Sequence, residues 1–434
     1  MMKNLLFISP PAFHVMAKPT GAACNLNCAY CFFLKKASLY PDSTFHMSDE
    51  VHDAYITQLF EAHRTPRITV AWQGGEPTLM GLGFFKRSVE FQKQQAKPGT
   101  VIENTFQTNG ILVDDEWCRF FHDNNFLVGL SLDGPRELHD IYRQDKGGQG
   151  TFERVMKTVR LLQKHKVEFN ILCTVNSKNA DYPLAVYRFF RDVARTPYIQ
   201  FIPIVERDNE TGYQEGNQVT DRSVRPKQYG RFLTEIFDEW VSRDVGQTFV
   251  LNFDGALAGW LDMAGTVCIF GPTCGLGMAL EDNGDLYSCD HFVEPKHFLG
   301  NILTTPMAEI IGSDRQRKFG QDKWDTLPSV CRECDLLFAC NGECPKNRFV
   351  ETSDGEPGLN YLCEGYKFFF QHADHSMKIM AALLRQGGRA EDIMKLGNHK
   401  NIEGENAKPA KLGRNDPCYC GSGQKLKNCH GREE

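Results

Sequence analysis

The chain has 434 residues, 41% of them hydrophobic and 24% charged, a globular composition long enough for about three domains of ~100–200 residues. Its 49 Lys and Arg residues against 55 Asp and Glu give a net charge of −6. This balance argues against a protein that coats nucleic acid or an anionic membrane, so we expect neither among its partners. Sixteen cysteines are too sparse for a small disulfide scaffold.

The first residues, MMKNLLFISPPAF, lack the apolar core and the cleavage site of a secretory signal. No apolar run reaches the ~20 residues of a membrane span. We therefore predict a cytoplasmic protein. In that compartment thiols stay reduced, so clustered cysteines indicate metal binding rather than disulfides.

Three cysteines crowd one early loop, Cys24, Cys28 and Cys31 in CNLNCAYC. Three thiolates at this spacing can hold three irons of a four-iron cluster and leave the fourth iron open for a substrate or cofactor. The alternatives are a zinc site or three unrelated thiols, although zinc prefers four ligands in two paired knuckles.

Apolar runs then alternate with amphipathic helical patterns. Strands are predicted at 67–72, 101–106, 126–132, 167–175 and 198–205, and helices at 49–62, 114–124, 151–164, 181–193 and 226–241. This alternation predicts an α/β fold with a parallel sheet, either a barrel or a doubly wound sheet. In both, chemistry is found at the carboxyl ends of the strands, where QGGEP, QTNG and SLDG occur.

The early loop and a glycine-rich segment together resemble the radical S-adenosylmethionine (SAM) superfamily. CNLNCAYC matches its CxxxCxxC signature with an aromatic residue before the last Cys, and Gly74-Gly75-Glu76-Pro77 matches its glycine-rich strand. The resemblance implies a partial (β/α)6 TIM-like barrel in which SAM chelates the open iron. One electron would cleave SAM to methionine and a 5′-deoxyadenosyl radical. The glycines would let the backbone approach the methionine moiety of SAM closely.

From Phe13 to about Tyr366 the sequence is similar to the anaerobic sulfatase-maturating enzymes, which convert a Cys or Ser of a sulfatase to formylglycine (3-oxoalanine). SLDGPRELHDIYR, TFERV and KVEFNILCTV carry the likeness. It implies five SAM-contacting residues, Tyr30, Gly75, Ser131, Arg143 and Val205. The alternatives are a helix cap for Ser131, a surface charge for Arg143 and core packing for Val205.

Eight further cysteines follow with the spacing C-x5-C-x14-C, then C-x2-C-x5-C-x3-C, then one more Cys. They suffice for two further four-iron clusters; a zinc-ribbon-like structural domain is the alternative. The pattern resembles the SPASM domain of peptide-modifying radical SAM enzymes, in which the two clusters are interleaved. The resemblance implies that Cys268, Cys274, Cys289 and Cys344 hold one cluster and that Cys331, Cys334, Cys340 and Cys363 hold the other.

Asp290 directly follows Cys289 in YSCDHF. In the sulfatase-maturating enzymes the matching Asp is the proposed base, so the likeness makes Asp290 the catalytic residue. Forming an aldehyde from –CH2–SH or –CH2–OH requires loss of a hydrogen atom, an electron and a proton, and a carboxylate beside a cluster ligand suits the last step. The alternatives are a carboxylate that solvates a loop, and His291 or Asp254 as the base.

A polar segment, GNHKNIEGENAKPAKLG, indicates a flexible linker near the C-terminus. The pattern C-x-C-x8-C-H follows it and combines three thiolates with one imidazole, a suitable tetrahedral zinc set. This tail resembles the SEC-C motif, which implies Cys418, Cys420, Cys429 and His430 as ligands. Contact with a protein or ribosome and a passive folded tag are alternative roles for it.

The predicted organisation is a radical SAM barrel at 1–245, a SPASM domain at 246–375, a helix and linker at 376–410 and the zinc motif at 411–434. We predict a sulfatase-maturating oxidoreductase with SAM, three 4Fe-4S clusters (one SAM-binding, two auxiliary) and zinc in the tail. Its predicted partners are an unfolded sulfatase polypeptide and an electron donor such as flavodoxin or ferredoxin. The alternatives are a maturase that crosslinks or epimerises a ribosomal peptide, and an iron–sulfur electron carrier or zinc-dependent adaptor.

Overall fold

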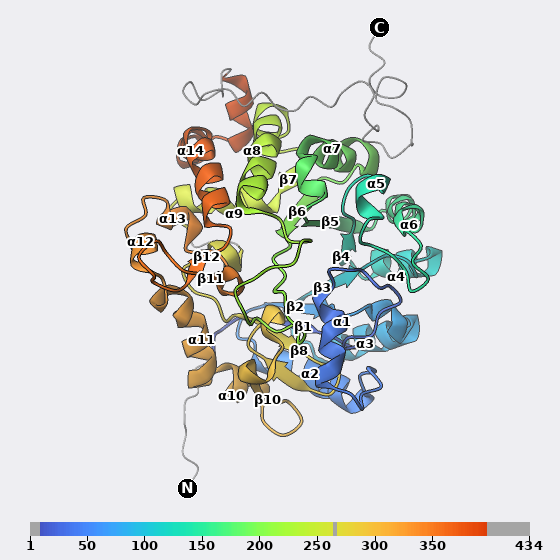
Figure 1. The fold of residues 1–434 in the computed structure, drawn as a ribbon. Helices are drawn as coiled ribbons and strands as arrows, with labels where there is room; N and C mark the ends of the chain where they lie inside the picture. The colour runs from blue at the N-terminus through green and yellow to red at the C-terminus, as the bar shows by residue number, and fades with distance from the viewer. Residues whose placement is uncertain (1–8, 264–266, 397–434) are drawn as a thin grey trace.

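The computed structural model describes residues 9–263 and 267–396, which form a ten-stranded sheet surrounded by helices and a separate two-stranded sheet (Figure 1). The order of hydrogen-bonded neighbours in the large sheet is β10-β9-β8-β1-β2-β3-β4-β5-β6-β7. The strands are β1 His14–Ala17, β2 Arg67–Trp72, β3 Val101–Thr108, β4 Phe126–Ser131, β5 Glu168–Val175, β6 Tyr198–Pro203, β7 Phe249–Val250, β8 Gly277–Leu280, β9 Asp285–Tyr287, β10 Phe298–Asn301, β11 Arg348–Val350 and β12 Leu359–Asn360. The helices are α1 Phe32–Lys35, α2 Asp49–Ala62, α3 Leu82–Gln95, α4 Asp115–Asp123, α5 Arg136–His139, α6 Phe152–Lys164, α7 Pro183–Arg188, α8 Pro226–Arg243, α9 Leu251–Trp260, α10 Met307–Ile311, α11 Asp314–Asp325, α12 Ser329–Arg332, α13 Leu337–Cys340 and α14 Cys363–Arg385.

Strands β1 to β6 lie side by side in chain order, and each pairs in parallel with the next. A doubly wound sheet would reverse its strand order partway, so the unbroken order identifies a barrel-type winding. Helices connect successive strands and cover the outer face (Figure 1). The predicted α/β fold with a partial (β/α)6 barrel is confirmed, and the carboxyl ends of its strands meet at one edge.

Local sequence explains where the barrel helices begin. The hydroxyl of Ser48 accepts a hydrogen bond from the backbone N–H of Val51 and caps α2. The carboxylate of Asp114 accepts hydrogen bonds from the backbone N–H groups of Glu116 and Trp117 and caps α4. Both α2 and α4 then bury one apolar face against the sheet, and each of these two helices begins within one residue of its predicted start.

The segment predicted as one helix over 181–193 is divided in the structure. Helix α7 begins at Pro183, because proline is tolerated in the first turn of a helix. It is followed by the π-helical segment Phe189–Ala194. Both Phe189 and Phe190 are fully buried there. The segment ends before Arg195, whose backbone is left-handed with a φ of 50°.

The Cys-rich part of the chain continues the sheet of the barrel. Strand β8 pairs in parallel with β1, with His14 opposite Gly277 and Ala17 opposite Leu280. Strands β9 and β10 then extend the sheet in antiparallel order. The two predicted domains therefore share one hydrogen-bonded sheet.

Helix α14 packs along α8, and two glycines allow the close approach. A Cβ atom on Gly365 would lie 2.2 Å from the carbonyl oxygen of Pro226, and one on Gly230 would lie 2.7 Å from that of Gly365. The rings of Tyr366 and Phe370 are buried and pack this helix against the core. The helix passes through the predicted boundary at 375 without a break.

Two cysteines outside the predicted metal sets, Cys118 in α4 and Cys173 in β5, are fully buried in the core. Among the helices of 9–263 and 267–396, none has the length and apolar character needed to cross a bilayer.

Candidate active site

A cavity of about 250 Å³ opens at the carboxyl ends of the barrel strands, between the barrel and the Cys-rich part. The predicted site residues that line it are Cys24, Cys28, Cys31, Tyr30, Gly75, Ser131, Arg143, Val205 and Asp290. The fold therefore brings together the early cysteine loop, all five positions implied for SAM and the implied base.

The cysteine loop follows β1 and is tied to the glycine-rich segment after β2. The backbone N–H of Gly75 donates to Gly21 at 2.9 Å, and that of Glu76 donates to Ala23 at 2.9 Å. A Cβ atom on Gly75 would lie 2.0 Å from the carbonyl oxygen of Ala23. Glycine is required here because the cysteine loop itself lies against it, a reason beyond the expected approach to SAM.

Glu76 joins this loop to the end of β3. Its fully buried carboxylate accepts hydrogen bonds from the hydroxyls of Thr78 at 2.6 Å and Thr108 at 2.8 Å, and from the backbone N–H of Asn109 at 2.8 Å. Burial raises the pKa of Glu76 above its ordinary value. The amide of Asn109 in turn donates to Asn25 at 2.7 Å, inside the cysteine loop. Glu76 therefore links the end of β3 to the loop that carries the three cysteines.

Asp133, in the SLDG segment after β4, organises the opposite wall. It accepts hydrogen bonds from the hydroxyl of Tyr30, from Arg143 at 2.8 and 3.2 Å and from the backbone N–H of Thr174 at 2.9 Å. Burial raises the pKa of Asp133, but Arg143 and the hydrogen bonds outweigh it and hold the pKa below its ordinary value. The Arg143 guanidinium also lies 5.5 Å from the ring centre of Tyr30.

Ser131, at the end of β4, and Val205, after β6, also line the cavity, with β5 between these two strands in the sheet. The hydroxyl of Ser131 accepts a hydrogen bond from Gln107 at 3.1 Å. Val205 follows β6 and is buried in the core while it contributes to the cavity wall. Val205 therefore both packs in the core and lines the cavity.

Asp290 follows β9 and reaches the cavity from the Cys-rich part. Its Oδ1 lies 2.6 Å from the Nζ of Lys18, and Lys18 also lies 3.2 Å from Oε1 of Glu281. These contacts are ion pairs rather than well-directed hydrogen bonds. Burial raises the pKa of Asp290, but Lys18, Lys36 and His291 together lower it to about 2.

Two other groups surround Asp290. The Nζ of Lys36 donates to the backbone oxygen of Asp290 at 2.8 Å and lies over the rings of Phe32 and Phe33. Burial lowers the pKa of Lys36 to about 7. His291 lines the cavity, and its Nδ1 lies 3.9 Å from the sulfur of Cys344. Asp254, the other alternative base, lies on α9, is not among the residues that line the cavity, and has a pKa raised to about 7 by burial.

The first auxiliary set gathers around Cys289. Burial, followed by Asp290 and the thiols of Cys268 and Cys274, raises the pKa of Cys289 to about 12. The pKa of Cys344 is raised mainly by burial, then by Glu343 and by the thiol of Cys289. Lys323 is buried among these cysteines, and its Nζ donates to the backbone oxygen of Cys268 at 2.6 Å.

The second auxiliary set gathers separately. The pKa of Cys331 is raised to about 11, mainly by burial and then by the thiols of Cys363 and Cys334. Burial, followed by Cys363, raises the pKa of Cys340 to about 12, with Cys331 also contributing. Cys340 and Cys344 are close in sequence, but beyond the effect of burial Cys363 and Cys331 raise the pKa of Cys340 whereas Cys289 raises that of Cys344.

The donor chemistry fits iron–sulfur clusters better than single ions. The thirteen cysteines of the described ranges are free thiols. Within those ranges no three His, Cys, Asp or Glu side chains converge as a single ion would require, and a zinc ion would draw its sulfur ligands to about 2.3 Å from one point. A four-iron cluster instead spreads its ligands over separate irons. The implied zinc ligands Cys418, Cys420, Cys429 and His430 lie outside the described residues.

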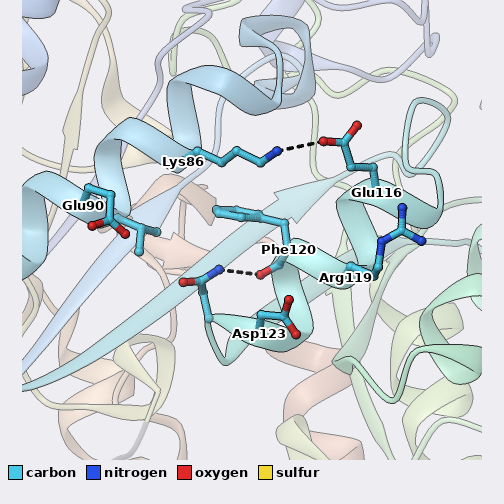
Figure 2. A pocket seen from close by; sticks show the side chains of 8 residues that line it. Lys86, Glu90, Glu116, Arg119, Phe120 and Asp123 are labelled. Carbon is cyan, nitrogen blue, oxygen red and sulfur yellow. Dashed lines mark hydrogen bonds and ion pairs between the residues drawn. The ribbon is translucent and has the colours of Figure 1, made fainter.

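A second hollow, of about 630 Å³, lies on the outer surface between α3 and α4 (Figure 2). Its charged side chains carry both signs, and Lys86 forms an exposed ion pair with Glu116 at 2.8 Å. None of the predicted site residues lines it.

Sequence reasoning missed Asp133, Glu76 and Lys18 as members of the site. Asp133 and Glu76 lie inside motifs that the sequence displays, SLDG and QGGEP, so their positions were visible but their contacts were not. Lys18 directly follows β1, and only the carboxyl-end rule for parallel strands could have indicated it.

Comparison with known proteins supports the same interpretation. The radical SAM superfamily matches residues 19–190, the iron–sulfur cluster-binding SPASM domain matches 273–335 and the SEC-C motif matches 414–432. A serine-type anaerobic sulfatase-maturating enzyme of Bacteroides thetaiotaomicron is 48% identical over 394 residues, 88% of this chain and 94% of that protein. A cysteine-type enzyme of Clostridium perfringens is 34% identical over 370 residues, 84% of this chain and 96% of that protein.

The solved structure of native anSMEcpe with bound AdoMet and Cp18Cys peptide is 34% identical and superposes with a TM-score of 0.77 over 86% of this chain and 99% of that chain. These matches extend across the barrel and the Cys-rich part, and they confirm the predicted iron–sulfur and SAM chemistry. The chain therefore belongs to the anaerobic sulfatase-maturating enzymes, radical SAM oxidoreductases that convert a Cys or Ser of a sulfatase to formylglycine.

Proposed function

We propose that this chain oxidises a serine of an unfolded sulfatase polypeptide in the cavity lined by the early cysteine loop, Arg143 and Asp290. The shared cavity carries the proposal, because hydrogen abstraction from the carbon and proton removal from its hydroxyl must act on the same –CH2–OH group. The preference for serine is supported by 48% identity to the serine-type Bacteroides enzyme, against 34% to the cysteine-type Clostridium enzyme.

Converting –CH2–OH to –CHO removes one hydrogen atom, one proton and one electron. When bound, SAM and the iron–sulfur clusters supply the radical that takes the hydrogen atom and the acceptor that takes the electron. The proton requires a base at the cavity wall, and we assign it to Asp290. Glu206 also lines the cavity and accepts hydrogen bonds from Arg222 at 2.8 and 2.9 Å, but the family resemblance places the base at Asp290.

The SAM site would be formed by the five implied residues. Arg143 and Tyr30 are held by Asp133, so both present fixed surfaces to the cavity. Gly75, Ser131 and Val205 would contribute close backbone, hydroxyl and apolar contacts. The position of all five on one cavity supports this assignment.

We assign three 4Fe-4S clusters to three cysteine sets. The SAM-binding cluster would use Cys24, Cys28 and Cys31; the first auxiliary cluster Cys268, Cys274, Cys289 and Cys344; the second Cys331, Cys334, Cys340 and Cys363. The free state of these thiols and the separate grouping of the auxiliary cysteines support the assignment. Cys418, Cys420, Cys429 and His430 would hold zinc in the tail, supported by the SEC-C match.

The proposed organisation keeps a barrel at 1–245, a SPASM domain at 246–375, a helix and linker at 376–410 and the zinc motif at 411–434. A cytoplasmic location suits the reduced clusters and a substrate modified before it folds. An electron donor such as flavodoxin or ferredoxin would reduce the SAM-binding cluster.

Matched peptides test the proposal. The protein is reconstituted anaerobically with iron and sulfide, then given SAM, reductant and a peptide bearing either SxPxR or CxPxR. We expect a mass loss of two hydrogens from the serine peptide, and faster turnover of it than of the cysteine peptide. Faster conversion of the cysteine peptide would overturn the serine preference.

The variant Asp290→Asn tests the assignment of the base. It should form 5′-deoxyadenosine with little formylglycine, and an undiminished yield of formylglycine would remove the assignment.

A further inference from the structure

Lys18 is a fully buried lysine at the carboxyl end of β1. Its Nζ lies 2.6 Å from Oδ1 of Asp290, 3.2 Å from Oε1 of Glu281 and 4.5 Å from the ring centre of Phe33. Its backbone N–H donates to Leu280 at 2.8 Å. Lys18 thus belongs to the barrel, while both carboxylates that it contacts belong to the Cys-rich part.

Burying an ammonium group is costly, and an ion pair repays that cost only with good geometry. A purely structural link between β1 and β8 would not require a charge, since an apolar side chain could fill the same space. The lysine is instead paired with Asp290, a carboxylate that lines the cavity and directly follows the implied cluster ligand Cys289. Lys36 differs, because its Nζ contacts the backbone oxygen of Asp290 and not the carboxylate.

We propose that Lys18 is a positioning residue that holds the Asp290 carboxylate at the cavity wall, with Glu281 anchoring Lys18 from the other side. A carboxylate free to rotate would spend part of its time away from the substrate hydroxyl, so that radical formation and proton removal would no longer be coupled. This inference rests on the proposed role of Asp290. It places the coupling of the two steps at the seam between the barrel and the Cys-rich part.

The test compares Lys18→Met with the parent enzyme, both anaerobically reconstituted and given SAM, reductant and the SxPxR peptide. We measure iron content, 5′-deoxyadenosine and formylglycine, and the ratio of the last two. We expect full iron content, 5′-deoxyadenosine formation within about threefold of the parent, and formylglycine per 5′-deoxyadenosine lower by at least about tenfold. Lys86→Met is the matched control, since Lys86 forms an exposed ion pair with Glu116 in the surface hollow between α3 and α4 (Figure 2).

An unchanged ratio in Lys18→Met would overturn the inference, and so would a parallel fall of both products, which indicates general damage. Because Met leaves two buried carboxylates without a cation, Lys18→Met with Glu281→Gln is a second variant with less uncompensated charge. Loss of the clusters in both variants would assign Lys18 to folding alone. If Asp290→Asn keeps the parent ratio, the role of Asp290 itself fails; if only Lys18→Met keeps it, the role of Lys18 fails.

Discussion

His139 is a buried side chain that can set the acid sensitivity of the cavity wall formed by Asp133 and Arg143. The backbone N–H of Asp133 donates to Nδ1 of His139 at 3.2 Å. The hydroxyl of Thr151 donates to the oxygen of Arg143 at 2.9 Å, so Nε2 of His139 must donate to Thr151, also at 2.9 Å. Burial lowers the pKa of His139 to about 3. The ring is therefore held neutral, in one tautomer, beneath Asp133 and Arg143.

This arrangement predicts a pH-dependent loss of stability. Unfolded His139 binds a proton near pH 6.5 and folded His139 only near pH 3. Between these values the unfolded state binds more protons, so stability falls as the pH falls, by about 1.4 kcal/mol per pH unit for this group. We expect His139→Gln to lose less unfolding free energy than the parent between pH 7.5 and pH 5.5. Anaerobic urea titrations of both proteins measure this difference, and equal losses would contradict it.

At the scale of residues, the sequence predicted those members of the site that belong to short, dense motifs. The three early cysteines could be named as a set from their spacing in one loop, whereas Gly75 and Asp290 were named from the resemblance to the sulfatase-maturating enzymes. Lys18 could not, because its carboxylate partners are more than two hundred residues away and only the β1–β8 pairing brings them to it.

At the scale of elements, most barrel units could be predicted closely because their apolar residues follow a strong period, although strand β1 and helix α3 were not predicted. Helix α2 has the predicted bounds, and β2 coincides with the predicted strand. The short strands β8 to β12 could not be predicted, because two to four residues are too few to show alternation. The division after α7 was also hidden, since an apolar run at helical spacing suits α- and π-helical turns alike.

The contact between the glycine-rich segment and the cysteine loop gives a prediction at this scale. In Gly75→Ala the added methyl group would meet backbone at 2.0 Å, so one loop must move. We expect loss of iron corresponding to the SAM-binding cluster, with the auxiliary clusters retained. Iron content and low-temperature EPR of the reduced protein measure this. Gly83→Ala, in the first turn of α3 with no atom within 4 Å of the new Cβ, is the control and should keep all clusters. Full iron content in Gly75→Ala would contradict the steric argument.

At the scale of the whole molecule, β1 is the central joint. It lies between β2 of the barrel and β8 of the Cys-rich part, and it leads directly to Lys18 and the cysteine loop. Helix α14 forms a second joint by packing on α8. The cavity is therefore built by both parts, and neither part contains the early cysteines and Asp290 together.

Two joints of this kind predict that the barrel and the Cys-rich part open together rather than as separate domains. Removing β8 would expose the edge of β1, whose flanking N–H groups at His14 and Lys18 donate to Leu276 and Leu280 at 2.7 and 2.8 Å. Separation of α14 from α8 would expose apolar surface on both helices. The favourable course is therefore one cooperative transition. Hydrogen-exchange mass spectrometry of the cluster-loaded protein in increasing urea measures this: peptides from β1 and β8 should lose protection at the same urea concentration. Loss of protection in β8 while β1 to β6 stay protected would show independent domains, and the shared sheet would then contribute little to stability.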